Sequence, residues 1–124
     1  MTGKRILVVD DNADAADAVA VLLSIEGHDV RTATTARAAL RETEAWRPEA
    51  LVLDIGLPDM DGYELARAIG ALALSPPPLM VALSGYGRPD DIARAHASGI
   101  TCHLLKPVDP EVLFAALQDQ HAHA

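Results

Sequence analysis

The stretch Leu51-Val52-Leu53-Asp54-Ile55-Gly56-Leu57-Pro58 decides the fold of this 124-residue chain. An apolar run ends on a carboxylate, with Pro48 before it and Gly56 and Pro58 directly after it. A run this short between turn residues is typical of a strand that is buried on both faces in a parallel sheet. Asp54 then lies at the carboxyl end of its strand, where open α/β sheets bind ligands. We expect this acid to have a partner, because an unpaired buried charge is costly.

The composition predicts one domain, residues 1–124, with an aliphatic core, because 50% of the residues are hydrophobic and only 3% are aromatic. Ten basic against eighteen acidic residues give a net charge of −8, which argues against direct contact with nucleic acid. The single cysteine, Cys102, cannot form an internal disulfide, so we expect a reducing compartment. The sequence shows neither a signal peptide nor a run that could span a bilayer, which predicts a cytoplasmic domain without direct membrane contact.

Strand patterns and helix patterns alternate along the whole chain. Strands are expected at residues 6–9, 28–33, 49–54, 79–83 and 103–105, and helices at 13–26, 35–46, 63–72, 89–98 and from 110 onward. Asp11 or Asn12 can cap the first helix, which carries Leu22 and Leu23 at apolar spacing. The last helix is expected to turn Val112 and Leu113 inward. This alternation predicts an α/β fold, a single-domain doubly wound five-stranded parallel sheet with helices on both faces.

Polar residues follow four of the expected strands directly, and carboxyl ends of parallel strands meet at one edge of a sheet. They are Asp10 and Asp11 after the first strand, Asp54 after the third, Ser84 after the fourth and Lys106 after the fifth. Two like charges about 4 Å apart repel by roughly 4 kcal/mol at an effective dielectric constant near 20. Lys106 alone cannot offset three carboxylates, so the pattern predicts a divalent cation, and oxygen ligands favour Mg²⁺.

A magnesium ion with few protein ligands usually also holds a phosphoryl group. Asp54 can then act as a nucleophile that accepts this group and becomes an aspartyl phosphate. Lys106 would neutralise the phosphoryl oxygens as a point charge, and Ser84 would donate its hydroxyl hydrogen to one of them. Positioning and charge neutralisation supply most of the catalysis in such a transfer.

With these residues in place, the chain resembles the response regulator receiver domains of two-component signalling over nearly its whole length. The resemblance implies a flavodoxin-like strand order of 2-1-3-4-5. It also implies that Asp54 is the phospho-acceptor, and that Asp11, Asp54 and the carbonyl of Gly56 bind Mg²⁺ directly, with Asp10 acting mainly through water. The Lys106-Pro107 bond is expected to be cis. A histidine kinase or a histidine phosphotransfer domain would be the phosphoryl donor.

Two positions depart from the family pattern. His103 stands where members often carry Tyr or Phe as a switch, so the expected switch pair is Ser84 and His103, although His103 can also be a simple packing residue. Gly56 offers no side chain to place a hydrolytic water and Tyr86 can screen the phosphate, which predicts slow dephosphorylation. The Gly85–Pro89 loop and the run from His103 resemble receivers joined to hybrid sensor kinases, so a hybrid kinase parent chain is possible.

Three other interpretations stay open at this level. A phosphohydrolase with an aspartyl-phosphate intermediate would also use Asp54, although such enzymes usually carry a second acid at the place of Gly56. A flavodoxin-like cofactor binder would share the fold, but no glycine-rich phosphate loop follows the first strand. Asp10 and Asp11 could also be simple helix-capping residues. For the leading hypothesis we expect no enzymatic activity beyond self-phosphorylation and slow autodephosphorylation.

Overall fold

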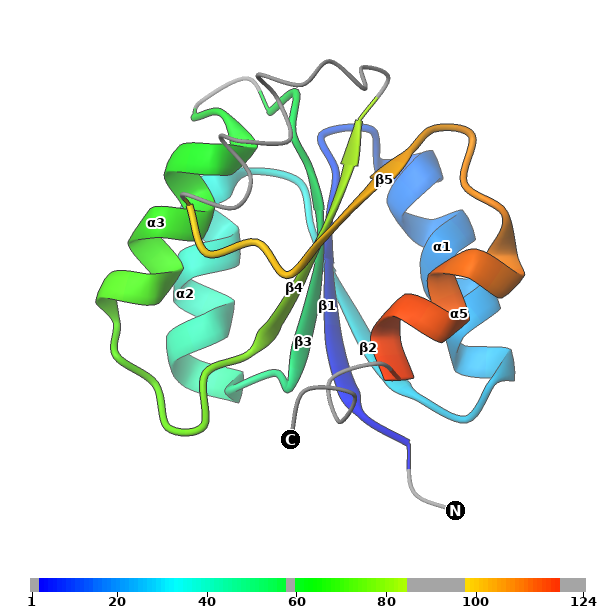
Figure 1. Ribbon diagram of the computed structural model, residues 1–124, viewed down its shortest axis with the longest axis horizontal. Coiled ribbons are helices and arrows are strands. Elements are labelled where there is room, and N and C mark those ends of the chain that lie inside the picture. Colours follow the sequence, from blue (N-terminus) through cyan, green and yellow to red (C-terminus); the bar gives the residue numbers. More distant parts are fainter. Residues whose placement is uncertain (1–2, 58–59, 85–97, 119–124) are drawn as a thin grey trace.

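A computed structural model describes residues 3–57, 60–84 and 98–118 of the chain (Figure 1). Its centre is a five-stranded, all-parallel sheet with the order β2-β1-β3-β4-β5. The strands are β1 (Arg5–Val9), β2 (Asp29–Ala33), β3 (Ala50–Asp54), β4 (Leu79–Ser84) and β5 (Cys102–Leu105). Both the doubly wound fold and the strand order predicted from the sequence are confirmed.

Helices cover the two faces of this sheet. They are α1 (Ala13–Ile25), α2 (Ala36–Trp46), α3 (Gly62–Ala71) and α5 (Pro110–Gln118). Figure 1 shows α2 and α3 on one side of the sheet and α1 and α5 on the other. The helix predicted over residues 89–98 falls almost entirely outside the described residues. Within the described ranges, every helix is too short or too polar to cross a lipid bilayer.

The core is divided by the sheet into two apolar layers, because alternate residues of a strand point to opposite faces. Leu51 and Leu53 of β3 pack with α2 and α3, whereas Ala50 and Val52 pack with α1 and α5. All five residues of β3 are buried, as the uninterrupted apolar run predicted. The strand that carries Asp54 is therefore held from both sides.

Side-chain caps fix the starts of three helices. Asn12 accepts a hydrogen bond from the amide of Ala15, so Asn12 rather than Asp11 caps α1. In the same way Thr35 caps α2 and Asp61 caps α3. Each cap satisfies one of the amide groups that a helix start leaves without an intrahelical partner. Asp11 is thereby left available at the carboxyl edge of the sheet.

Two apolar residues on the predicted helix stripes, Leu22 and Val112, are exposed rather than buried. Leu22 is 37% exposed and Val112 is 48% exposed. The buried positions are Ala16 and Leu23 in α1 and Leu113 and Leu117 in α5, so the inward prediction for Leu113 is confirmed. Ala16 and Leu23 are seven residues apart and so share one helix face, which defines the stripe that meets the sheet. Apolar spacing alone did not distinguish this stripe from the neighbouring one.

Candidate functional site

Three carboxylates converge at the carboxyl edge of the sheet, where the sequence predicted them. Asp54 is the last residue of β3, and Asp10 and Asp11 follow the last residue of β1, which pairs with β3 in parallel. One carboxylate oxygen from each of the three residues lies within 4.8 Å of the other two. Asp10 and Asp54 are each only 9% exposed, whereas Asp11 is exposed. The strand pairing therefore concentrates negative charge in one partly buried place.

The pKa of Asp10 reflects its burial and the negative charges around it. Burial raises the pKa of the Asp10 carboxyl, and the charges of Asp54 and Asp11 raise it further. A hydrogen bond of 2.9 Å from the Asn12 amide and the charge of Lys106 act in the opposite direction on the same pKa. Because the net pKa shift is upward, the ionised form of Asp10 is disfavoured here relative to water. An added cation at this place would reverse that balance.

Lys106 supplies the positive charge at the same carboxyl edge, from the end of the outer strand β5. Its Nζ atom lies 3.1 Å from Oδ1 of Asp54 and 3.9 Å from Oδ2 of Asp10. The amide of Lys106 donates a hydrogen bond of 2.8 Å to the carbonyl of Ser84, which continues the pairing of β4 and β5. The Lys106-Pro107 bond is cis, as expected. Lys106 thus lies within ion-pair distance of two of the three acids, although β5 is two strands away from β3 and three strands away from β1.

Ser84 and His103 also lie together. Ser84 Oγ and His103 Nε2 are 2.8 Å apart, a hydrogen-bond distance. Because Ala82 and Ser84 pair with His103 and Leu105, the two side chains are diagonal neighbours on one face of the sheet. The hydroxyl expected at the site is thus in contact with the residue that departs from the family pattern. Tyr86, which was expected to screen the phosphate, lies outside the described residues.

The chain just after Asp54 is shaped by two glycines. The Gly56 amide donates a hydrogen bond of 3.1 Å to Oδ1 of Asp54, which orients this carboxylate. The Gly62 amide donates one of 2.9 Å to the carbonyl of Ile55. A Cβ atom on Gly62 would lie 2.7 Å from Cα of Ile55 and 3.0 Å from the carbonyl oxygen of Asp54. No real Cβ atom fits at 2.7 Å, so glycine allows α3 to start directly against the end of β3.

Sequence reasoning missed this role of Gly62. The Asp61-Gly62 dipeptide was interpreted only as part of a turn. A glycine directly after a helix-capping aspartate, just beyond a buried strand, is a signal for close backbone approach that could have revealed it.

The acidic group fits the predicted ion. Asp10, Asp11 and Asp54 offer carboxylate oxygens, which Mg²⁺ prefers over nitrogen and sulfur ligands. The nearest positive charge, the Lys106 ammonium, is single and faces three negative groups. The position of the Gly56 amide is defined by its bond to Asp54, whereas metal binding by the Gly56 carbonyl stays a prediction.

Comparison with known proteins identifies the family. The sequence profile of the response regulator receiver domain matches residues 6–118, so the chain belongs to this family. An uncharacterized 14.6 kDa protein from Leptolyngbya boryana is 39% identical over 113 residues, which cover 91% of this chain and 86% of that protein. The transcriptional regulatory protein PrrA of Mycobacterium tuberculosis is 35% identical over 107 residues. Those residues cover 86% of this chain but only 45% of PrrA, so the chain spans less than half of that relative.

Solved structures agree with this assignment. A CheY-like response regulator receiver domain from Methanospirillum hungatei shares 30% identity at a TM-score of 0.87, with 98% of this chain and 96% of that chain covered. The chemotaxis response regulator CheY4 of Vibrio cholerae shares 29% identity at a TM-score of 0.87, covering 94% and 98%. The chain is therefore a receiver domain, the phospho-accepting switch of two-component signalling. Domains of this family bind Mg²⁺ at an acidic pocket and interact with histidine kinases or phosphotransfer proteins.

Proposed function

We propose that Asp54 is the residue that accepts the phosphoryl group, and that Lys106 and Ser84 assist the transfer. The observation that carries this proposal is the Lys106 ammonium 3.1 Å from Oδ1 of Asp54, within a group of three acids. Asp54 is the acid of this group at the end of a fully buried strand. The amide of Gly56, two residues further on, orients its carboxylate.

The transfer is a displacement at phosphorus. A carboxylate oxygen of Asp54 forms the new P–O bond while the P–N bond of a donor phosphohistidine breaks, and its electron pair stays on the imidazole nitrogen. The Lys106 ammonium stabilises negative charge on the phosphoryl oxygens from its place beside Asp54. The Ser84 hydroxyl donates a hydrogen bond to one of these oxygens.

In this proposal Asp10, Asp11, Asp54 and the Gly56 carbonyl hold Mg²⁺. The ion, when bound, would neutralise part of the charge that three carboxylates and a phosphoryl group bring together. The raised pKa of Asp10, caused by burial and by its acidic neighbours, shows that the negative charge here is not fully compensated.

The switch follows from the contact between Ser84 and His103. We expect the Ser84 hydroxyl to reorient when it donates its hydrogen to a phosphoryl oxygen, which changes its contact with His103. His103 then loses or changes its present partner, and β5 responds. A new charge at Asp54 thereby shifts a two-state equilibrium and alters the surface that partners bind.

The test uses acetyl phosphate with Mg²⁺ and intact-protein mass spectrometry. The wild-type protein is expected to gain the mass of one phosphoryl group, and Asp54→Asn to gain none. Asp61→Asn is the matched control, because Asp61 is a nearby acid that caps α3 and Asn caps a helix equally well. Labelling that survives Asp54→Asn would contradict the choice of Asp54. Equal labelling in excess chelator would contradict the role of the metal.

The finer expectations about partners and lifetime are predictions. Family membership supports a histidine kinase or phosphotransfer domain as the donor, whereas a hybrid kinase parent chain and a cytoplasmic location rest on the sequence alone. Slow dephosphorylation is supported by Gly56, which is exposed and carries no side chain beside Asp54. Gly56 also argues against a phosphohydrolase, because such enzymes usually carry a second acid at this position.

A further inference from the structure

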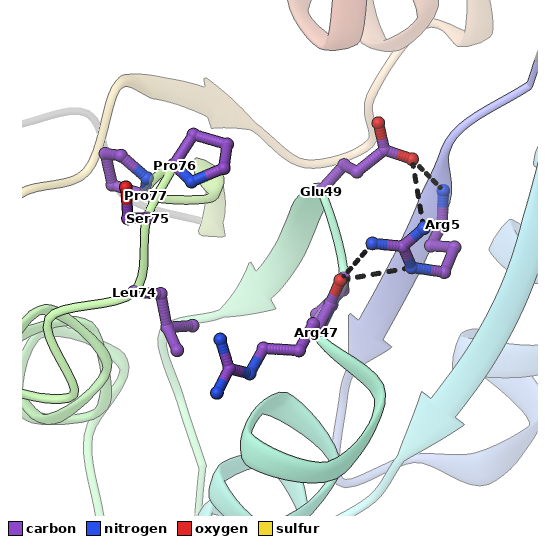
Figure 2. Close-up of a pocket in the computed structure, with 8 residues that line it drawn as sticks. Arg5, Arg47, Glu49, Leu74, Ser75, Pro76 and Pro77 are labelled. Carbon is purple, nitrogen blue, oxygen red and sulfur yellow. Dashed lines mark hydrogen bonds and ion pairs between the residues drawn. The ribbon is translucent and has the colours of Figure 1, made fainter.

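A recess of about 460 Å³ opens at the opposite, amino edge of the sheet (Figure 2). It lies between the start of β1, the end of α2 and the loop that precedes β4. Its lining residues are Arg5, Arg47, Pro48, Glu49, Leu74, Ser75, Pro76 and Pro77. The volume lies within the range of roughly 300–1,000 Å³ that is typical of small-molecule sites.

One side of the recess is a fixed charged pair. Nε and Nη2 of Arg5 donate hydrogen bonds of 3.1 and 2.7 Å to the carbonyl of Arg47. The Arg5 amide donates one of 3.0 Å to Oε1 of Glu49, and Nη1 of Arg5 lies 3.9 Å from the same oxygen. These contacts hold Arg5 and Glu49 in place before any ligand arrives, which reduces the entropy cost of binding.

Arg47 provides a positive charge with unused donors. It ends α2 in the left-handed conformation, with a φ of 56°. Its Nε donates a long hydrogen bond of 3.4 Å to the Glu44 carbonyl, and its two terminal nitrogens have no hydrogen-bond partner among the described residues. Figure 2 shows its guanidinium group extending toward Leu74, away from Arg5 and Glu49. The planar fork of a guanidinium group matches the two oxygens of a carboxylate.

The charges around the recess select the class of ligand. Arg5 and Arg47 are positive and Glu49 is negative, so one net positive charge faces the space. A monoanion balances this charge, whereas a phosphate dianion would also be repelled by Glu49 and by the overall charge of −8.

The remaining walls are apolar. Pro48, Leu74, Pro76 and Pro77 also line the recess, and proline rings lose little conformational freedom when a ligand packs on them. We propose that this recess binds a small organic monocarboxylate that carries a compact apolar group. The carboxylate would pair with Arg47, and the apolar group would lie against Leu74 and the prolines.

The experiment is a titration of the ¹⁵N-labelled protein with phenylacetate, followed by NMR of the arginine Nε–H groups and the backbone amides. Saturable shifts at Arg5, Arg47 and residues 74–77 are expected. Phenylacetamide, which lacks the charge, and inorganic phosphate are expected to leave these signals unchanged. Absence of saturation, or equal binding of phenylacetamide, would overturn the proposal.

Variants test the role of Arg47. Arg47→Ala is expected to weaken phenylacetate binding at least tenfold, and Arg47→Lys to give an intermediate affinity because the charge stays but the fork is lost. Arg41→Ala is the matched control, an exposed arginine on the same helix that does not line the recess. Equal binding by Arg47→Ala and wild type would refute the site. Labelling of Asp54 by acetyl phosphate should be normal in Arg47→Ala, so this proposal can fail without affecting the proposed function.

Discussion

The two edges of the sheet treat charge in opposite ways. At the carboxyl edge, Asp10, Asp11 and Asp54 crowd together with one lysine, and the pKa of Asp10 is raised. At the amino edge, Arg5 is bound both to Glu49 and to a backbone carbonyl. The comparison teaches that like charges gather where the proposed chemistry needs an ion, whereas charges of both signs alternate at the amino edge and Arg5 is satisfied within the chain. Variants at the two edges test this difference.

The largest expected effect concerns the glycine that lets α3 approach β3. Gly62→Ala should destabilise the fold by about 1–3 kcal/mol, the usual range for forcing extra atoms into a packed site, because its Cβ would meet the backbone of Ile55. Gly70→Ala is the matched control in the same helix. No atom lies within 4 Å of its added Cβ, so this change should stabilise by about 0.4–1 kcal/mol. Urea unfolding measures both, and equal effects of the two changes would show that the contact at Gly62 is unimportant.

The next largest change in stability is expected when one of the three clustered acids loses its charge. Asp10→Asn should stabilise the metal-free protein by on the order of 1 kcal/mol, because it removes a buried charge and keeps an acceptor for the Asn12 amide. Protonation of Asp10 should stabilise the fold in the same direction as Asp10→Asn. Because the pKa of Asp10 is raised in the native state, the native protein takes up this proton at a higher pH than the unfolded chain does. Stability from Asp10 therefore increases as pH falls through its raised pKa toward 3.8.

Thermal unfolding in chelator and in excess Mg²⁺ tests this effect of Asp10. The advantage of Asp10→Asn should shrink or reverse in Mg²⁺, since the ion would stabilise the wild-type acids. A variant that is less stable than wild type in chelator would mean that the acids are already compensated within the chain.

A smaller effect is expected where α2 ends. Arg47 adopts a φ of 56°, a conformation that glycine reaches without a steric penalty. Arg47→Gly should stabilise by about 0.5 kcal/mol, the difference between this relief and the greater freedom of glycine in the unfolded chain. The Arg5 hydrogen bonds should persist because they reach the backbone carbonyl. A loss of stability in urea unfolding would show that the Arg47 side chain itself holds this edge together.

The smallest expected effect is the pH response of His28 at the amino edge. Burial, and secondarily the charge of Lys4, lowers the pKa of His28, whose Nδ1 accepts a hydrogen bond from the Lys4 amide. The unfolded chain therefore takes up this proton first, and stability should fall as pH drops below about 6.5. The free energy of unfolding should depend less on pH in His28→Gln than in the wild type. It is measured from about pH 7.5 to about 5.5, on both sides of the ordinary histidine pKa of ~6.5. Parallel profiles would remove His28 as the cause.

Most of the fold could be predicted because its strands are short apolar runs between turn residues. The run at residues 51–54 and the polar residues after four of the strands placed Asp10, Asp54 and Lys106 at one edge, and the structure brings them together. Helix faces were less certain: Leu22 and Leu23 are adjacent and both apolar, and only packing against the sheet selects Leu23.

What the sequence could not provide depends on contacts between distant residues. The hydrogen bond between Ser84 and His103 requires the register of β4 and β5, which pairs His103 with Ala82. The recess requires Arg5 to meet the Arg47 carbonyl across 42 positions of the chain. Neither register nor such long-range contacts are encoded in local spacing, so both emerged only from the three-dimensional structure.

The strand order has a mechanical consequence. The acids belong to the two inner strands β1 and β3, whereas Lys106 follows β5, which borders the sheet and has only one neighbouring strand. Residues of β3 are all buried, but those of β5 are half-buried or exposed. An outer strand can shift at a lower free-energy cost than a central one. We therefore expect β1 and β3 to keep their positions while β5, with His103 and the following Lys106, moves. Motion that starts with a new charge on Asp54 should therefore travel toward β5 and α5 and leave α2 at rest.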